Sequence, residues 1–201
     1  MTTGQPPQPM KFVSAIIIWA TLSSGMLTNK RIPIFAAPSR SVAAAIGDSQ
    51  RASQTVILFL NWYKVHLQTI SRITLVNQSP GKPYSVNLNN GERYLTYLRG
   101  SHLLTGAYLG EWRTYFKERD AGFRLSPQYE GPPIGFEYDL VMLNQEVDLQ
   151  LASLKSLKID KVTIVSNKAT VGLTLFGSYE FRLVRRNDRW MINEILNIGA
   201  E

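Results

Sequence analysis

The chain of 201 residues contains no cysteine, and this absence removes several kinds of chemistry. Without cysteine there can be no disulfide, no thiolate metal site, no thiol nucleophile and no lipid-modified cysteine of a lipoprotein. Histidine is also scarce: His66 and His102 stand far apart and form neither a His-x-His nor a His-x-x-x-His pattern. We therefore expect no metal site.

The sequence also lacks the short motifs that mark common enzymes. It has no Gly-x-Ser-x-Gly turn, no Walker loop and no dinucleotide fingerprint. We accordingly predict no catalytic residue and no cofactor.

Acidic residues are missing from the first 45 positions, and this asymmetry accounts for most of the net charge of +7. Residues 46–201 hold 18 basic and 15 acidic side chains, a net charge of +3. The longest basic run in that part is Arg185-Arg186, so the composition argues against nucleic-acid binding.

An uncharged apolar run, FVSAIIIWATLSSGML, covers residues 12–27 and follows Lys11. Small residues come next, and Ala43 and Ala45 satisfy the Ala-x-Ala rule for signal cleavage. The run is shorter than the roughly 20 residues of a comfortable membrane span. We predict that residues 1–45 are a secretory signal peptide and that the protein is exported, periplasmic or otherwise extracytoplasmic. Met10 is a more natural start for such a signal than Met1.

Two other interpretations of this leader remain. It could be an uncleaved single-pass membrane anchor with a linker, or a buried core helix. Pro33 and Pro38 isolate the run from the body, which disfavours the core helix. If the leader is uncleaved, it would be the membrane contact of the chain.

The first half of the body has helical periodicity. Residues 48–73 show apolar positions at spacings of 3, 4 and 7, with Ser53 as a plausible start. A second helix is predicted from about residue 91 to Gly100, and a third from about residue 103 to 119. Residues 77–92 and 122–139 are rich in Pro and Gly and predict loops, the first with at most a short strand.

The second half changes to a period of two from Val147 onward. In SLKIDKVTIVSNKATVGLTLFGSYEFRLVRRNDRWMINEILNI, four alternating runs are separated by short polar turns. This pattern predicts an antiparallel meander with one covered face, and we expect Trp190 to anchor it to the helices. Residues 46–201 are thus predicted to form a single α+β domain, with N-terminal helices packed on a curved antiparallel sheet.

Helices followed by a meander with a charged turn and Trp-x-Ile resemble the nuclear transport factor 2-like (cystatin-like) superfamily. FLNWYKVHL, YLRGSHLLTGAYLGEW and YDLVMLNQEVD further resemble a family of uncharacterised bacterial exported proteins and lipoproteins. The resemblance covers roughly residues 50–198. Lipoprotein members need a cysteine after the signal, which this chain lacks.

The resemblance implies a cone-shaped fold whose mouth can hold a small molecule. Some relatives use an Asp/His pair there as enzymes, and many only bind. It also implies that YDLVMLNQEVD lies at the rim of the cone, where Asp139 and Gln145 would contact a ligand. The residues themselves offer a simpler role for Asp139, which is to cap a short helix through Leu143.

The other polar candidates also have structural explanations. His66 lies near the edge of the apolar face of its helix, where a half-buried, hydrogen-bonded histidine is expected more often than a catalytic one. His102 is interpreted as a loop or helix-start residue beside a capping Ser101. The remaining acidic candidates are Glu111, Glu137, Glu146 and Asp148.

Aromatic residues are numerous in the helical half, and most are expected in the core. The alternative to a core position is that some of them line a ligand pocket, namely Trp62, Tyr63 and Trp112 together with His66. The ligand-binding candidates are therefore Asp139, Gln145, Trp62, Tyr63, His66 and Trp112.

Three functions remain open from sequence. The first is an exported, non-catalytic binding or interaction domain with a possible small-molecule pocket in the cone. The second is a hydrolase or isomerase with Asp139 or His66 as its base, which rests on fold analogy. The third is an envelope subunit or toxin inhibitor that binds through the open face of the sheet. The sequence does not predict the oligomeric state.

Overall fold

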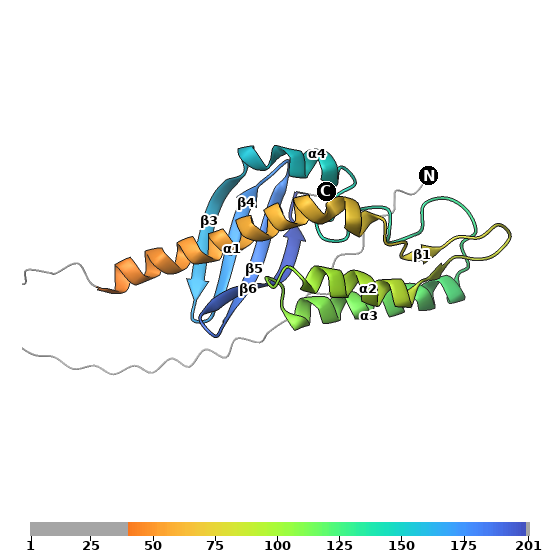
Figure 1. The fold of residues 1–201 in the computed structure, drawn as a ribbon, viewed down its shortest axis with the longest axis horizontal. Helices are drawn as coiled ribbons and strands as arrows, with labels where there is room; N and C mark the ends of the chain where they lie inside the picture. The colour runs from red at the N-terminus through yellow and green to blue at the C-terminus, as the bar shows by residue number, and fades with distance from the viewer. Residues whose placement is uncertain (1–39, 200–201) are drawn as a thin grey trace, which may run out of the picture.

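A computed structural model describes the backbone of residues 40–199 and the side chains of residues 47–199. In this part of the chain the fold is α+β, with four α-helices, a four-stranded antiparallel sheet and a small two-stranded sheet (Figure 1). The elements, in chain order, are α1 (Arg40–Ser71), β1 (Val76–Asn77), β2 (Ser85–Val86), α2 (Leu88–Arg99), α3 (Gly106–Leu125), α4 (Val147–Ala152), the 3-10 helix η1 (Ser153–Ser156), β3 (Lys158–Val165), β4 (Lys168–Thr174), β5 (Ser178–Arg186) and β6 (Arg189–Asn197).

The four-stranded sheet is the predicted meander, with strand order β3-β4-β5-β6. Alternate side chains of its central strands are buried, and Val171 of β4 lies opposite Phe181 of β5. Period two therefore places one apolar face inward, as the sequence indicates. The start of this half was predicted wrongly, because residues 147–156 are helical and the first strand begins only at Lys158.

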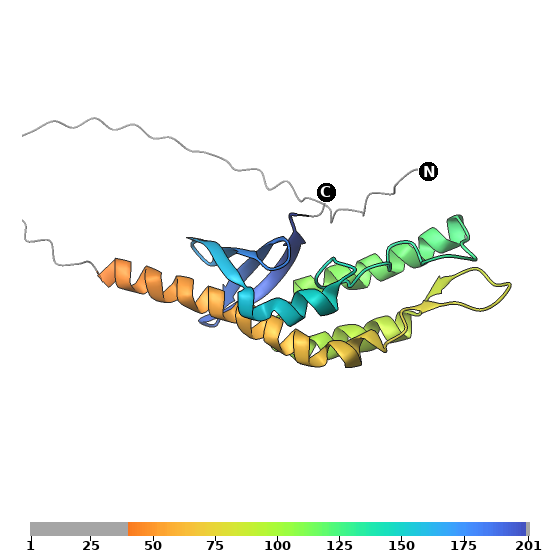
Figure 2. The ribbon, with the colours of Figure 1, turned by 90° about the horizontal axis from the view of Figure 1, so that it is seen from above.

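Helix α1 lies across the inner face of the sheet (Figures 1 and 2). Its buried side chains have the predicted helical spacing, and the sheet and helices α2 and α4 surround them. They are Ala52, Val56, Phe59, Leu60, Tyr63, Leu67 and Ile70. The helix begins earlier than predicted: Ser53 lies inside it and bonds back to the carbonyl of Ser49 (3.0 Å) instead of capping the start.

Helices α2 and α3 pack against each other and extend away from the sheet (Figure 2). Asn87 caps α2 through Asn90 N, and Thr105 caps α3 through Tyr108 N, each at 3.0 Å. Helix α3 continues to Leu125, beyond the predicted end at residue 119, because buried Phe123 extends its packed face. The predicted loop after it is correspondingly shorter.

Trp190 is buried, as predicted, and anchors β6 to the core. The guanidinium of Arg185 lies 5.1 Å from its ring centroid and also bonds to Asp48 of α1 (2.9 Å). Leu103 and Thr105, on the segment before α3, bond to Ile192 and cover the outer edge of β6. These contacts join the sheet to both α1 and α3.

The leader lies outside the described residues, and its cleavage or anchoring stays a prediction. The proposed boundary after Ala45 falls within α1, whose backbone begins at Arg40 (Figure 1). Between residues 40 and 199, the structure has no helix with the length and apolar character needed to span a bilayer.

Candidate functional site

The segment predicted to form the rim folds into a tight turn around Asp139. Its Oδ1 accepts hydrogen bonds from the backbone N–H groups of Val141 (3.0 Å) and Met142 (2.7 Å). The ends of the turn close through Asp139 N and Asn144 O (3.0 Å), with Leu143 at φ 50°. The predicted short helix is therefore wrong, although Asp139 does perform the capping role that was expected of it.

The second carboxylate oxygen of Asp139 is also occupied. The hydroxyl of Tyr63, on α1, donates to Oδ2 at 2.5 Å, and Tyr63 is fully buried. Burial raises the pKa of Asp139 above its ordinary 3.8, while the bonds from Tyr63, Met142 and Val141 act in the opposite direction. Two of the predicted ligand contacts, Asp139 and Tyr63, thus bind each other.

Two further tyrosines surround this pair. Burial raises the pKa of Tyr63, Tyr94 and Tyr108, and the negative charge of Asp139 adds to the effect at each. All three phenols therefore remain protonated at neutral pH and can act as hydrogen-bond donors. The hydroxyl of Tyr108 is buried without a hydrogen-bond partner among the described residues.

The other side of the turn is held by the sheet and α4. The Tyr179 hydroxyl donates to Met142 O (2.8 Å), and Asn197 Nδ2 donates to Leu143 O (3.2 Å). Gln150, which is fully buried, donates to Tyr179 Oη (2.7 Å) and to Leu175 O (2.9 Å). The turn is therefore a structural link between α1, α4 and the sheet.

Gln145, the predicted glutamine contact, is exposed on the surface. The buried glutamine is Gln150, which the sequence reasoning missed. Its position between Leu149 and Leu151 was the available signal, because a polar residue inside an apolar stretch needs buried partners.

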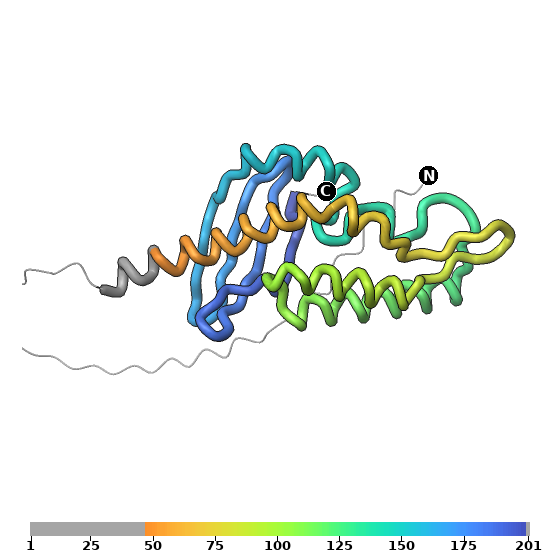
Figure 3. The backbone as a smooth tube through the Cα atoms, viewed as in Figure 1, coloured from red at the N-terminus to blue at the C-terminus, as the bar shows by residue number. Residues whose placement is uncertain are grey.

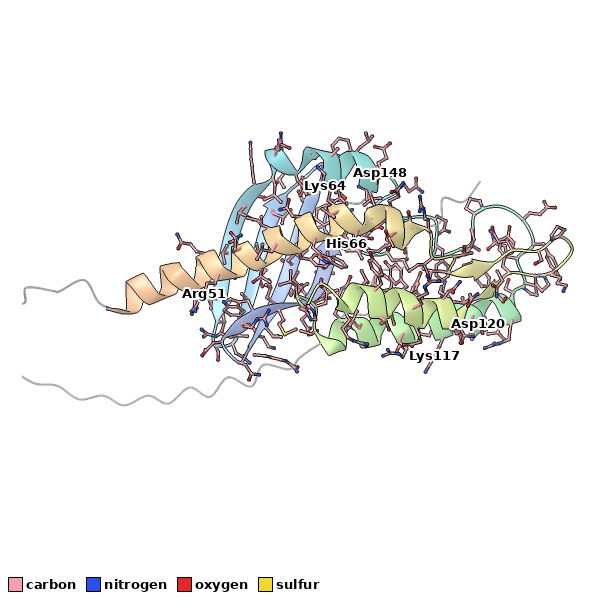
Figure 4. All side chains as sticks on the ribbon, in the orientation of Figure 1. Arg51, Lys64, His66, Lys117, Asp120 and Asp148 are labelled. Atoms are coloured by element: carbon pink, nitrogen blue, oxygen red, sulfur yellow. The ribbon has the colours of Figure 1, made fainter. Side chains whose placement is uncertain are left out.

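A second cluster lies on the part of α1 next to α2. The rings of Trp62 and His66 stack, with centroids 4.4 Å apart and planes 25° from parallel. His66 Nδ1 shares a hydrogen bond with the hydroxyl of Tyr97, on α2, at 2.8 Å. All three residues are half-buried, so the expectation of a half-buried, hydrogen-bonded histidine is confirmed. Figure 4 shows His66 on the part of α1 that faces α2.

Beside this cluster, two exposed residues of α1 are apolar, although the neighbouring exposed residues Gln54, Asn61 and Lys64 are polar. Leu58 is 50% exposed and Val65 is 77% exposed, and Trp62 lies between them at helical spacing. We name Leu58, Trp62 and Val65 the outer stripe. Exposed Arg51 lies before Leu58 on the helix, and exposed Arg72 directly follows its last residue, Ser71. Helix α1 thus has one apolar face in the core and a short line of three apolar side chains at the surface.

Trp112 does not join the Trp62–His66 stack, but its ring contacts Tyr108, one of the tyrosines around Asp139. It lies half-buried on α3 among Tyr108, Tyr115 and Phe116, with ring centroids 5.3 to 6.4 Å away. His102 is exposed in the loop before α3 at φ 57°, with Ser101 Oγ accepting from Leu103 N at 3.3 Å.

The other acidic candidates lie on the surface. Glu111 is exposed on α3, and its pKa is raised by partial burial and by the charge of Glu194. Glu137, Glu146 and Asp148 are exposed as well. No group of three or more His, Asp or Glu side chains in the described part of the chain is arranged to hold a metal ion.

Comparison of the chain with protein-family models, with curated proteins and with solved structures found no match.

Proposed function

We propose that the protein is an exported, non-catalytic interaction domain that binds a protein partner through the outer stripe. We further propose that its fold is the cone of the nuclear transport factor 2-like (cystatin-like) superfamily. The long α1 across a four-stranded meander supports the fold proposal. The apolar leader at residues 12–27 supports export.

The case against catalysis rests on Asp139. A general base needs a free lone pair directed at the substrate, and a second titratable group that converges on the same point. Three of the roughly four lone-pair sites of the Asp139 carboxylate already accept bonds from within the chain, from Tyr63, Val141 and Met142, which leaves one site on Oδ2. His66 bonds to Tyr97 of α2 and does not pair with Asp139.

The single observation that carries the binding proposal is the outer stripe of α1. A surface helix ordinarily turns polar residues to water, yet Val65 is 77% exposed and Leu58 is 50% exposed. Half-buried Trp62 lies between them, and tryptophan and tyrosine are enriched at the energetic centres of protein interfaces. His66 stacks on Trp62 and fixes the orientation of its ring.

The shape of this surface fits a protein segment. Seven residues separate Leu58 from Val65, which places their Cα atoms about 10 Å apart along the helix. Two turns of a partner helix have about this length. Such a helix could pack its apolar side chains between α1 and Tyr97. Arg72 would form part of the polar rim at one end.

Site-specific photocrosslinking in the producing cell tests this proposal. A benzophenone amino acid is placed in the full chain at position 58 or 65, and at position 117 as the control. Lys117 is exposed on α3, away from the outer stripe (Figure 4). We expect a discrete adduct from 58 and 65 and none from 117. Equal labelling at all three positions, or none, would contradict the proposal, and an adduct of two copies of this chain would identify the partner as a second copy.

A further inference from the structure

Two strand turns lie side by side at one end of the sheet, the end nearer to the start of α1 (Figures 1 and 3). One joins β3 to β4 and the other joins β5 to β6; Arg185 N donates to Asn167 O between them at 2.7 Å. Helix α1 is attached to the same place, because Arg185 Nη1 bonds to Asp48 at 2.9 Å.

This end is basic. It carries Arg51, Lys168, Arg185, Arg186 and Arg189 and two acidic residues, Asp48 and Asp188, for a net charge of +3. We name these residues the basic end. Since residues 46–201 as a whole carry 18 basic and 15 acidic side chains, the remaining 13 of each sign cancel. The entire charge excess of the body is thus at this end.

Most cations of the basic end are not neutralised by an acidic partner. Asp48 pairs with Arg51 and Arg185, but within the described residues Lys168, Arg186 and Arg189 form no ion pair. Arg186 and Arg189 stand directly opposite each other in the β5–β6 register, and like charges in that position destabilise a hairpin. A tight turn holds them there, with Asn187 at φ 49° and Asp188 at φ 57°.

The leader joins the chain beside this surface. Twelve residues, 28–39, separate the apolar run from the start of α1 at Arg40. Fully extended, they span at most about 40 Å. If the apolar run is in a membrane, before cleavage or permanently, a linker of this length lets the basic end reach the lipid headgroups.

We infer that the basic end docks the domain on a membrane surface that contains anionic phospholipid. Cationic side chains near such a surface are attracted to it over about one Debye length. Val165, which is 69% exposed at the tip of the β3–β4 turn, would enter the headgroup region between the cations. The outer stripe extends along α1 away from this end, so docking leaves it open to a partner. This inference does not depend on the proposed partner binding.

Hydrogen–deuterium exchange on the full chain tests the inference. The protein is reconstituted into vesicles of phosphatidylcholine alone and into vesicles that also contain phosphatidylglycerol. Because the leader inserts in both, the readout is exchange in the two turns, residues 165–168 and 186–189. We expect exchange there to slow by about fivefold or more on the anionic vesicles only, and high salt to abolish the difference.

The test variant is Arg186→Glu with Arg189→Glu. This double change keeps a like-charge pair across the hairpin and leaves the Arg185 contacts to Asp48 and Trp190 in place. The matched control is Lys64→Glu with Lys117→Glu, which makes the same change in net charge at exposed sites away from the turns. We expect the protection to be lost in the first variant and kept in the control.

Equal exchange of the wild type on both kinds of vesicle would overturn the inference. So would equal loss of protection in the two variants, because net charge alone would then explain the effect. Protection of the same size by a DNA duplex, in place of vesicles and at the same ionic strength, would overturn the assignment to lipid.

Discussion

Replacement of Asp139 by Asn probes the turn that joins α1 to the sheet. An asparagine Oδ1 can accept the same two backbone bonds, from Val141 N and Met142 N. On the other side, an amide would replace the oxygen that accepts from Tyr63. A charge-assisted bond of about 1.5–3 kcal/mol would become a neutral bond of about 0.5–1.5 kcal/mol.

The same substitution removes a buried charge, and this gain offsets part of the loss. Burial raises the pKa of Asp139, which means that the surroundings disfavour its ionised form. We therefore expect the free energy of unfolding at neutral pH to change by no more than about 1 kcal/mol.

The pH dependence of this change is the sharper test. Because the folded pKa of Asp139 lies above its unfolded value, the group contributes most stability below that unfolded value, and the contribution is lost as the pH rises through the folded pKa. Asparagine does not titrate. The stability of the wild type relative to Asp139→Asn should therefore fall as the pH rises from about 4 toward neutral. Urea denaturation of both proteins over this range measures the difference, in which the other carboxyl groups cancel.

Tyr63→Phe supplies the companion measurement. Its hydroxyl lowers the pKa of Asp139, so its removal should raise that pKa further and steepen the loss of stability with pH. A difference between wild type and Asp139→Asn that is constant with pH would refute the reasoning. An increase in the stability of the wild type relative to Asp139→Asn as the pH rises would also refute it, because the pKa of Asp139 in the folded state would then be depressed.

Three other perturbations test the packing and the leader. Trp190→Ala should destabilise the fold by about 3–5 kcal/mol in chemical denaturation, and a loss under about 1 kcal/mol would mean that the side chain is peripheral. Gly91→Ala should lower the free energy of unfolding by about 1–3 kcal/mol, because the added Cβ would lie 2.9 Å from the Phe116 ring. Gly122→Ala on α3 should be neutral or stabilising by up to about 1 kcal/mol, because its added Cβ would have no atom within 4 Å. N-terminal sequencing of the protein from the extracytoplasmic fraction should give Ile46 as the first residue, and an intact leader there would favour the anchor instead.

The elements that the sequence predicted well have long, regular periods. Helix α1 repeats apolar residues over several turns, and β4 to β6 alternate for seven or nine residues each. A repeated period averages out local exceptions, so both the helix and the meander could be recognised from sequence alone.

The helical start of the second half was missed because its period is ambiguous. Val147, Leu149 and Leu151 alternate as in a strand, yet they lie in α4. The buried residues there are Gln150 and Leu151, while Leu149 is 59% exposed. Six residues are too few for periodicity to decide between helix and strand, and the tertiary bonds of Gln150 to Tyr179 and Leu175 favour the helix.

The sequence predicted which residues belong to the candidate site but not which of them would hydrogen-bond to each other. Asp139, Tyr63 and His66 were all nominated, and the structure gives each a hydrogen-bond partner. The partner of His66 is Tyr97, 31 residues away, and Tyr63 and Asp139 are 76 residues apart. Pairings at such separations depend on how the helices and the turn pack together, which local patterns do not encode.

Thermal shift against a panel of small apolar and anionic metabolites tests the central claim most directly, namely that Asp139 belongs to the scaffold and not to a ligand site. Wild type and Asp139→Asn are compared compound by compound. The account predicts that any compound that stabilises the wild type also stabilises the asparagine variant by a similar amount. A compound that raises the melting temperature of the wild type and leaves that of Asp139→Asn unchanged would contradict it, and would make the carboxylate of Asp139 a ligand contact.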